Sequence, residues 1–141
     1  MDAPLLVHGG AVARGESGVL ILGAPASGKS DLMLRLIHHG FTLVADDQVL
    51  VADGQASPPP TLAGLLEVRG LGIVRLPWRR AALRLAVLLE PGERLPQPEY
   101  WQPLDLPVIR LEAGHASAAL RVALALDCLE GTLPMVAGAF A

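Results

Sequence analysis

One segment near the N-terminus limits the folds that this chain can adopt. It matches the whole P-loop pattern G-x-x-x-x-G-K-[ST] and consists of Gly23, Ala24, Pro25, Ala26, Ser27, Gly28, Lys29 and Ser30. A P-loop follows a buried strand and opens a helix, so that backbone amides surround a phosphate group. Residues 19–22 form an apolar run, and residues 29–39 carry a helical apolar stripe. The segment therefore predicts an α/β fold with a nucleoside triphosphate site.

The lysine of this loop stands alone in the composition. Lys29 is the only lysine among the 11 lysine and arginine residues of the chain. A tight backbone loop accommodates a compact ammonium group between two phosphates, but not the wide guanidinium fork. We therefore expect Lys29 to contact the β- and γ-phosphates of a nucleoside triphosphate, and the Ser30 hydroxyl to bind Mg²⁺.

The bulk composition excludes several other classes of protein. With 141 residues, of which 52% are hydrophobic, we expect one domain spanning residues 1–141. A net charge of -3 and a pI near 5.7 argue against a nucleic-acid partner. No apolar stretch approaches the roughly 20 residues of a membrane helix, and no signal-peptide pattern is visible. A single cysteine excludes an internal disulfide, so a cytoplasmic protein is expected.

The pattern of apolar residues predicts more strands than helices. We expect helices at 29–39 and 116–129, and a loop at 91–103 with Tyr100 and Trp101 packed onto the domain. Strands are expected at 5–8, 11–13, 19–22, 41–45, 48–52, 83–89 and 106–111. This is too much sheet for a strictly alternating βαβ fold, so a mixed sheet with few helices is predicted.

Two carboxylates follow the strand expected after the P-loop helix. Asp46 and Asp47 resemble a Walker B element, whose acids hold Mg²⁺ or take a proton from an incoming hydroxyl. Neighbouring residues on a strand point to opposite faces, so we expect only one of the two to face the phosphates. The alternative is a solvated turn.

Other polar residues are less specific when taken alone. Glu67 and Arg69 would share one face of an extended segment, where a Mg²⁺-binding carboxylate and a guanidinium could serve phosphoryl transfer. A surface ion pair is the simpler reading of these two residues. His8 ends a short strand, and a lone histidine is more often structural than catalytic.

Taken together, these segments resemble the catalytic domain of HPr kinase/phosphorylase. The resemblance lies in His8-Gly9, the P-loop, residues 43–47 (Leu-Val-Ala-Asp-Asp) and residues 66–73 (Leu-Glu-Val-Arg-Gly-Leu-Gly-Ile). It is close from about residue 5 to 74 and weak beyond. It implies a homo-oligomeric kinase that phosphorylates a serine of the phosphocarrier HPr, and that runs the reverse phosphorolysis. The implied fold is a P-loop domain of the PEP carboxykinase-like type.

The resemblance also implies a role for each matching residue. Asp47 corresponds to the general base toward the substrate serine, and to the general acid in the reverse direction. His8 and Lys29 correspond to further active-site residues, and Ser30 and Glu67 to the Mg²⁺ ligands, with Asp46 beside them. Arg69 lies in the stretch that serves both directions.

The sequence also departs from the family pattern. A late Pro-Gly-Arg-Asn motif is missing, with Arg110 near its expected place but not assigned its role, and Ala26 replaces a glycine of the loop. The residues before His8 are too few for the family's N-terminal domain, and the tail is short. An alternative to the kinase is therefore a nucleotide-sensing module that binds ATP without phosphoryl transfer. A small-molecule kinase is disfavoured because no long arginine-bearing insertion offers a lid.

Overall fold

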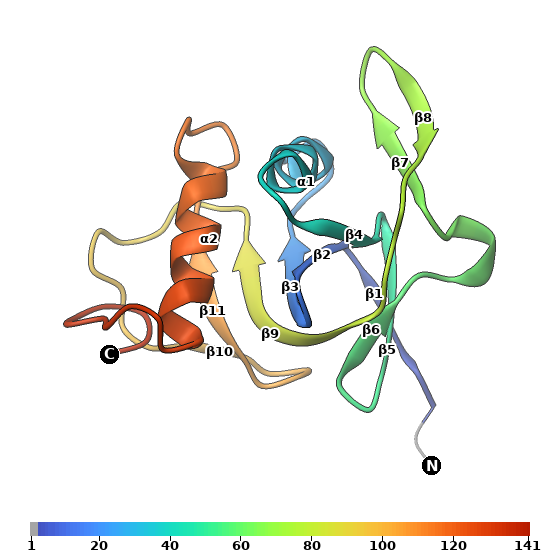
Figure 1. The fold of residues 1–141 in the computed structure, drawn as a ribbon. Helices are drawn as coiled ribbons and strands as arrows, with labels where there is room; N and C mark the ends of the chain where they lie inside the picture. The colour runs from blue at the N-terminus through green and yellow to red at the C-terminus, as the bar shows by residue number, and fades with distance from the viewer. Residues whose placement is uncertain (1–2) are drawn as a thin grey trace.

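A computed structural model describes residues 3–141 of the chain, which fold into one large sheet, a separate hairpin and two α-helices (Figure 1). The helices are α1 (Lys29–His38) and α2 (Ala118–Leu129), with a short 3-10 helix at Pro60–Leu62. The strands are β1 (Leu5–His8), β2 (Gly10–Arg14), β3 (Ser17–Leu22), β4 (Thr42–Ala45), β5 (Gln48–Ala52), β6 (Gln55–Ser57), β7 (Leu65–Val68), β8 (Gly72–Arg75), β9 (Ala81–Leu88), β10 (Tyr100–Trp101) and β11 (Leu106–Arg110).

The large sheet is mixed and has nine strands. Seven of them follow the order β1-β5-β6-β9-β3-β2-β4, and β11 pairs with both β9 and β10. The β3–β9 and β9–β11 pairs are parallel, whereas the other pairs of this sheet are antiparallel. Within residues 3–141, strands β7 and β8 pair only with each other, and they project from the rest of the fold beside α1 (Figure 1).

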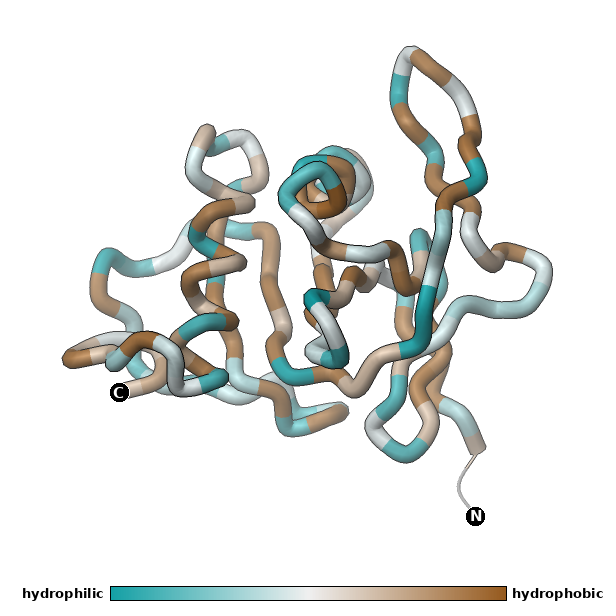
Figure 2. The backbone as a smooth tube through the Cα atoms, viewed as in Figure 1, coloured by the Kyte–Doolittle hydropathy of each residue, from teal (hydrophilic) through white to brown (hydrophobic). Residues whose placement is uncertain are grey.

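Two apolar cores lie on the two faces of this sheet. On one face, α1 buries Leu32, Met33 and Leu36 against the sheet, and α2 buries alanine, valine and leucine side chains there. On the other face the sheet curls, and residues of β1, β5 and β6 pack against those of β2, β3 and β4. Alternation along β3 serves both cores, and Figure 2 shows the brown apolar residues along the central strands.

A bulge in β9 changes which face its side chains reach. The β3–β9 register shifts between Gly18 and Val19, whose partners are Leu83 and Leu85. Arg84 is thus the extra residue, and it is exposed. Because of this insertion, Leu83 belongs to the core under the curl whereas Leu85 belongs to the core under the helices.

The structure confirms the mixed sheet and the two helices, and it corrects several local expectations. The helices are shorter than expected: α1 ends at His38, and α2 begins at Ala118. The segment 91–103 is not all loop, because β10 pairs with β11, and the side chain of Tyr100 is 52% exposed instead of packed down. Within residues 3–141, no helix is both long and apolar enough to span a membrane.

Candidate functional site

The P-loop connects β3 to α1, and its backbone depends on residues that tolerate unusual dihedral angles. Gly28 has φ 90° and caps α1, and Ala26 has φ 64°. A Cβ atom at Gly23 would lie 2.3 Å from Ser27 Oγ, so a larger residue there would force Ser27 to shift. Alternation of such residues turns successive amides toward one point, as in an anion-binding nest.

Ala26 is the strained member of this loop. It adopts a left-handed conformation that glycine reaches freely and that costs another L-residue roughly 1–2 kcal/mol. Alanine at this position therefore keeps the loop geometry at an energetic cost.

The polar groups of the loop fit a bound phosphate. Lys29 is half-buried, and no carboxylate of the described residues lies within ion-pair distance of it. The hydroxyl of Ser27 is buried, and residues 3–141 offer it no hydrogen-bond partner. The first-turn amides of α1 lack partners within the helix, as at any helix start. An anion between these groups would satisfy all of them.

Asp46 joins the start of α1 to the projecting hairpin. Ser30 Oγ donates a hydrogen bond to Asp46 Oδ1 over 3.1 Å, and the Glu67 amide donates to Asp46 Oδ2 over 3.3 Å. No cluster of three or more His, Cys, Asp or Glu in the described chain could hold a metal. Mg²⁺ fits this donor set nevertheless, since it usually takes one or two carboxylates beside substrate phosphates and water.

Asp47 and His8 come together through the backbone. Asp47 lies in the bend between β4 and β5 with φ 71°, and its carbonyl accepts a hydrogen bond from the Gly9 amide over 3.1 Å. Glycine at position 9 also lets β3 lie close, because a Cβ there would be 2.8 Å from the carbonyl oxygen of Ile21. The premise that both aspartates continue a strand is wrong, since β4 ends at Ala45.

Glu67 and Arg69 are also placed differently from the sequence prediction. Glu67 is on β7, but that strand ends at Val68 and Arg69 lies in the turn toward β8. The two side chains therefore do not share a face of an extended strand. Within the described chain no ion pair joins them, so the surface ion pair is not found either.

All residues predicted for the site line one cleft of about 1130 Å³. It brings together His8, residues 23–30, both aspartates, Glu67 and Arg69. Both Asp46 and Asp47 line it. That only one of them faces the phosphates stays a prediction. Sequence reasoning missed further lining residues, namely Asp31, Leu34, Val68, Leu71 and Ile73. Gly70 and Gly72 also line the cleft. Glycines in this segment were the available sequence signal for a turn of the backbone at the site.

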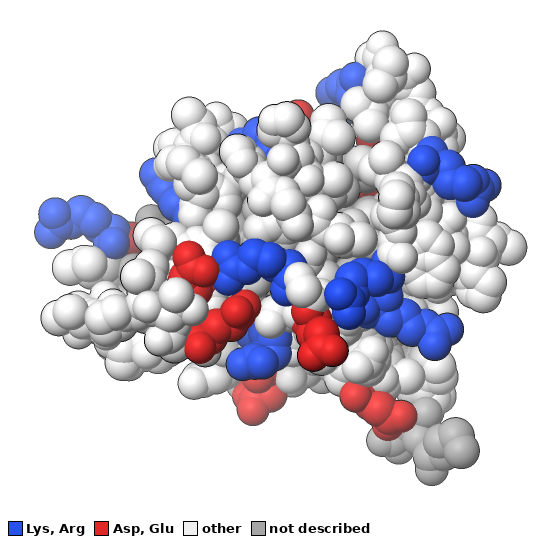
Figure 3. Space-filling view, viewed as in Figure 1, with Lys and Arg blue, Asp and Glu red and all other residues white. Residues whose placement is uncertain are grey.

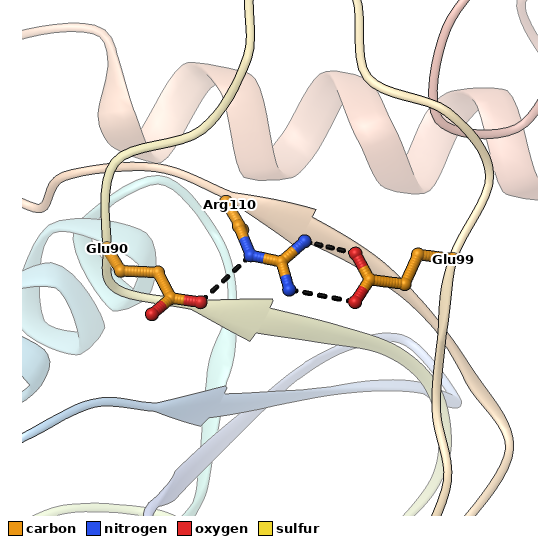
Figure 4. Close-up of polar contacts among 3 residues, drawn as sticks. All are labelled: Glu90, Glu99 and Arg110. Carbon is orange, nitrogen blue, oxygen red and sulfur yellow. Dashed lines mark hydrogen bonds and ion pairs between the residues drawn. The ribbon is translucent and has the colours of Figure 1, made fainter.

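Arg110 takes no part in this cleft. Its guanidinium forms a paired contact with the Glu99 carboxylate, and Nε donates to Glu90 Oε1 over 2.8 Å (Figure 4). The hydrogen bonds to Arg110 lower the pKa of Glu99, and those to Glu99 and Glu90 raise the pKa of Arg110. We call Glu90, Glu99 and Arg110 the Arg110 cluster.

Comparisons with known proteins cover both the site and the fold. The family described as HPr Serine kinase C-terminal domain matches residues 3–78. A protein named HPr kinase/phosphorylase from Cupriavidus metallidurans is 40% identical over 126 residues, covering 73% of this chain and 39% of that protein. One of the same name from Shouchella clausii is 44% identical over 75 residues, covering 50% and 24%.

A solved structure supports the fold beyond residue 78. The Hpr(Ser) kinase/phosphatase from Coxiella burnetii superposes with a TM-score of 0.73 at 22% identity, over 91% of this chain and 97% of that one. The chain spans less than two fifths of the length of these two curated relatives. Since the family match extends over more than half of the chain, the chain belongs to the family of the HPr serine kinase C-terminal domain.

Proposed function

We propose that this chain is the catalytic domain of an ATP-dependent protein-serine kinase whose acceptor is the phosphocarrier HPr. One observation carries the proposal: the cleft gathers every polar residue of the family motifs, although these are scattered from His8 to Arg69. The names of the relatives support HPr as the acceptor. Phosphorolysis of the phosphoserine, with inorganic phosphate as acceptor, is the proposed reverse reaction.

The P-loop supplies binding and charge stabilisation in this proposal. Lys29 is free of carboxylate partners in the described chain. Its ammonium group can therefore stabilise the negative charge of the terminal phosphate in the transition state. The loop amides and the Ser27 hydroxyl hold the remaining phosphate oxygens. Phosphoryl transfer depends mainly on such positioning and charge stabilisation.

Asp47 is the proposed general base. The serine hydroxyl oxygen of the acceptor forms a bond to the γ-phosphorus while the bond to the bridging oxygen breaks and ADP leaves. The proton of the serine passes to the exposed Asp47 carboxylate at the cleft. His8 lines the cleft beside it, tied through Gly9 to the Asp47 carbonyl.

The proposed metal ligands are Ser30 and Glu67, with Asp46 between them. The hydrogen bonds of Asp46 to Ser30 Oγ and to the Glu67 amide hold these two residues on one side of the cleft. Mg²⁺ supplies neutralisation of phosphate charge when bound. Arg69, in the turn between β7 and β8, is proposed to contact the transferring phosphate in both directions.

The proposal also includes the fold type, the domain, the cellular location and the assembly. The fold is assigned to the PEP carboxykinase-like type of P-loop domain, residues 1–141 to one domain, and the location to the cytoplasm. Residues 1–2 lie outside the described range. A homo-oligomer is the proposed assembly, with no nucleic-acid or membrane partner.

Incubation of the chain with ATP, Mg²⁺ and purified HPr tests the proposal. We expect one phosphoserine on HPr by mass spectrometry, and none when HPr is omitted or when its acceptor serine is replaced by alanine. Saturable ATP binding without phosphoserine would instead support the nucleotide-sensing module. Absence of ATP binding would contradict both functions.

A further inference from the structure

The rim of the cleft carries exposed apolar side chains on one side. Among the exposed large hydrophobic residues of the described chain, Leu71 and Ile73 line the cleft, with 75% and 69% of their surface exposed. Both lie on the β7–β8 hairpin, which projects beside α1 (Figure 1). A nucleotide bound in the P-loop does not account for apolar side chains at the mouth of the cleft.

A cationic segment continues this rim away from the cleft. Residues 68–89 contain five arginines and no aspartate or glutamate, although the chain has a net charge of -3. Arg75, Arg79 and Arg80 are exposed, and within residues 3–141 no carboxylate pairs with them. Figure 3 shows blue side chains gathered over the chain that leads from β8 into β9.

Backbone contacts with β4 hold this segment against the large sheet. The Arg79 amide donates to the Leu43 carbonyl over 3.0 Å, and Trp78 forms a bridge with the same residue of β4. Trp78 is 42% exposed and lies against Gly64, where a Cβ would be 3.2 Å from its ring. Arginine and tryptophan held in place are the residue types that dominate binding energy at protein interfaces.

We propose that Leu71, Ile73, Arg75, Trp78, Arg79 and Arg80 form the docking surface for the acceptor protein. The inference rests on the proposed kinase function. A protein acceptor is too large for the cleft and must rest on its surroundings, and this surface is continuous with the cleft through β8. It fits an acceptor that has an apolar side chain beside its serine and carboxylates farther away.

Charge reversal away from the cleft tests this surface. The double variant Arg79→Glu/Arg80→Glu should raise the Kd for HPr by about tenfold or more, measured by calorimetry with a non-hydrolysable ATP analogue. Neither residue lines the cleft, so the Kd for the nucleotide should stay within about twofold. If charge reversal impairs folding, the milder Arg79→Gln/Arg80→Gln variant replaces it. This variant should raise the Kd for HPr by a smaller factor.

Two further variants separate this surface from general effects of charge and polarity. Arg94→Glu/Arg121→Glu is the matched control, because both arginines are exposed, lie outside the cleft and have no carboxylate partner in the described chain. It should leave the HPr Kd within about twofold. Ile73→Ser at the rim should weaken HPr binding by about fivefold.

The outcomes distinguish docking from catalysis. An unchanged HPr Kd in the charge-reversed variant, or no HPr binding by the unaltered chain, overturns the docking surface. The same holds if reversal abolishes self-association or duplex DNA binding while HPr binding persists. If HPr binding depends on Arg79 and Arg80 but no phosphoserine forms, the docking surface is supported and only the kinase function is contradicted.

Discussion

In the cleft, Lys29 has no carboxylate within ion-pair distance among the described residues, whereas Arg110 on β11 contacts two. The Asp46 carboxylate, which also lines the cleft, accepts hydrogen bonds from the Ser30 hydroxyl and the Glu67 amide instead. In the Arg110 cluster, cation and carboxylates satisfy one another and tie β11 to the segment 90–99 (Figure 4). In these two regions, therefore, the paired charges of the Arg110 cluster hold chain segments together, and the unpaired ammonium of Lys29 is left for a ligand.

Replacement of Lys29 should have the largest effect on activity and the clearest bearing on this comparison. Lys29→Met removes the unpaired ammonium and should lower the rate of HPr phosphorylation by about 10³-fold. Folding should be unaffected, because the side chain has no partner to lose. Phosphoserine formation and thermal unfolding measure the two effects.

Arg121→Met is the matched control for that variant. It removes an exposed cation that also lacks a carboxylate partner in the described chain but lies outside the cleft. A similar loss of activity in both variants would mean that net charge, not the phosphate contact, explains the effect of Lys29.

Replacement of Arg110 should have the opposite pattern. Arg110→Met removes the partner of Glu90 and Glu99 and should lower the melting temperature by a few degrees, with ATP affinity unchanged. Differential scanning fluorimetry with and without nucleotide measures both. Lost nucleotide binding at unchanged stability would place Arg110 in the site.

The pH dependence of stability tests whether the Arg110–Glu99 pair causes the destabilisation of Arg110→Met. Because pairing with Arg110 lowers the pKa of Glu99 below its ordinary value of 4.5, the stabilisation is complete above that value. It is lost as the pH falls through the lowered pKa of the folded state, since the protonated carboxyl no longer pairs. The stability difference between the unaltered chain and Arg110→Met should therefore be constant near neutral pH and shrink in acid.

The strained P-loop residue offers the smallest effect. Ala26→Gly relieves a left-handed alanine at φ 64°, and should raise the free energy of unfolding by about 0.5 kcal/mol after the extra chain entropy of glycine is counted. Ala24→Gly is the control, because Ala24 is outside the left-handed region and gains only the entropy cost. Urea unfolding of both variants should shift in opposite directions.

The parts of the molecule that the sequence predicted are those with strong local patterns. The P-loop sits between an apolar strand and an amphipathic helix, and the aspartates follow a run of buried residues, so position and chemistry could be inferred together. Strands β6 and β10 were missed because three and two residues are too few to display a period of two.

Other features depend on partners distant in sequence. The bulge at Arg84 arises from pairing with β3, which the residues around it do not reveal. Arg69 was misplaced because the chain turns directly after β7 ends at Val68, where Gly70 and Gly72 adopt φ values of 81° and 140°. The contact of Asp46 with the Glu67 amide likewise appears only in the folded chain.

The most direct test of the account is single-turnover phosphorylation of HPr by Asp47→Asn. Asparagine tolerates the φ of 71° and preserves the shape of the side chain, so only the proton-accepting charge is lost. We predict that the affinity for ATP and Mg²⁺ stays within about twofold while phosphoserine formation falls by about 10²-fold or more. Phosphoserine formation at the unaltered rate would contradict the role of the cleft as a site of phosphoryl transfer with Asp47 as its base.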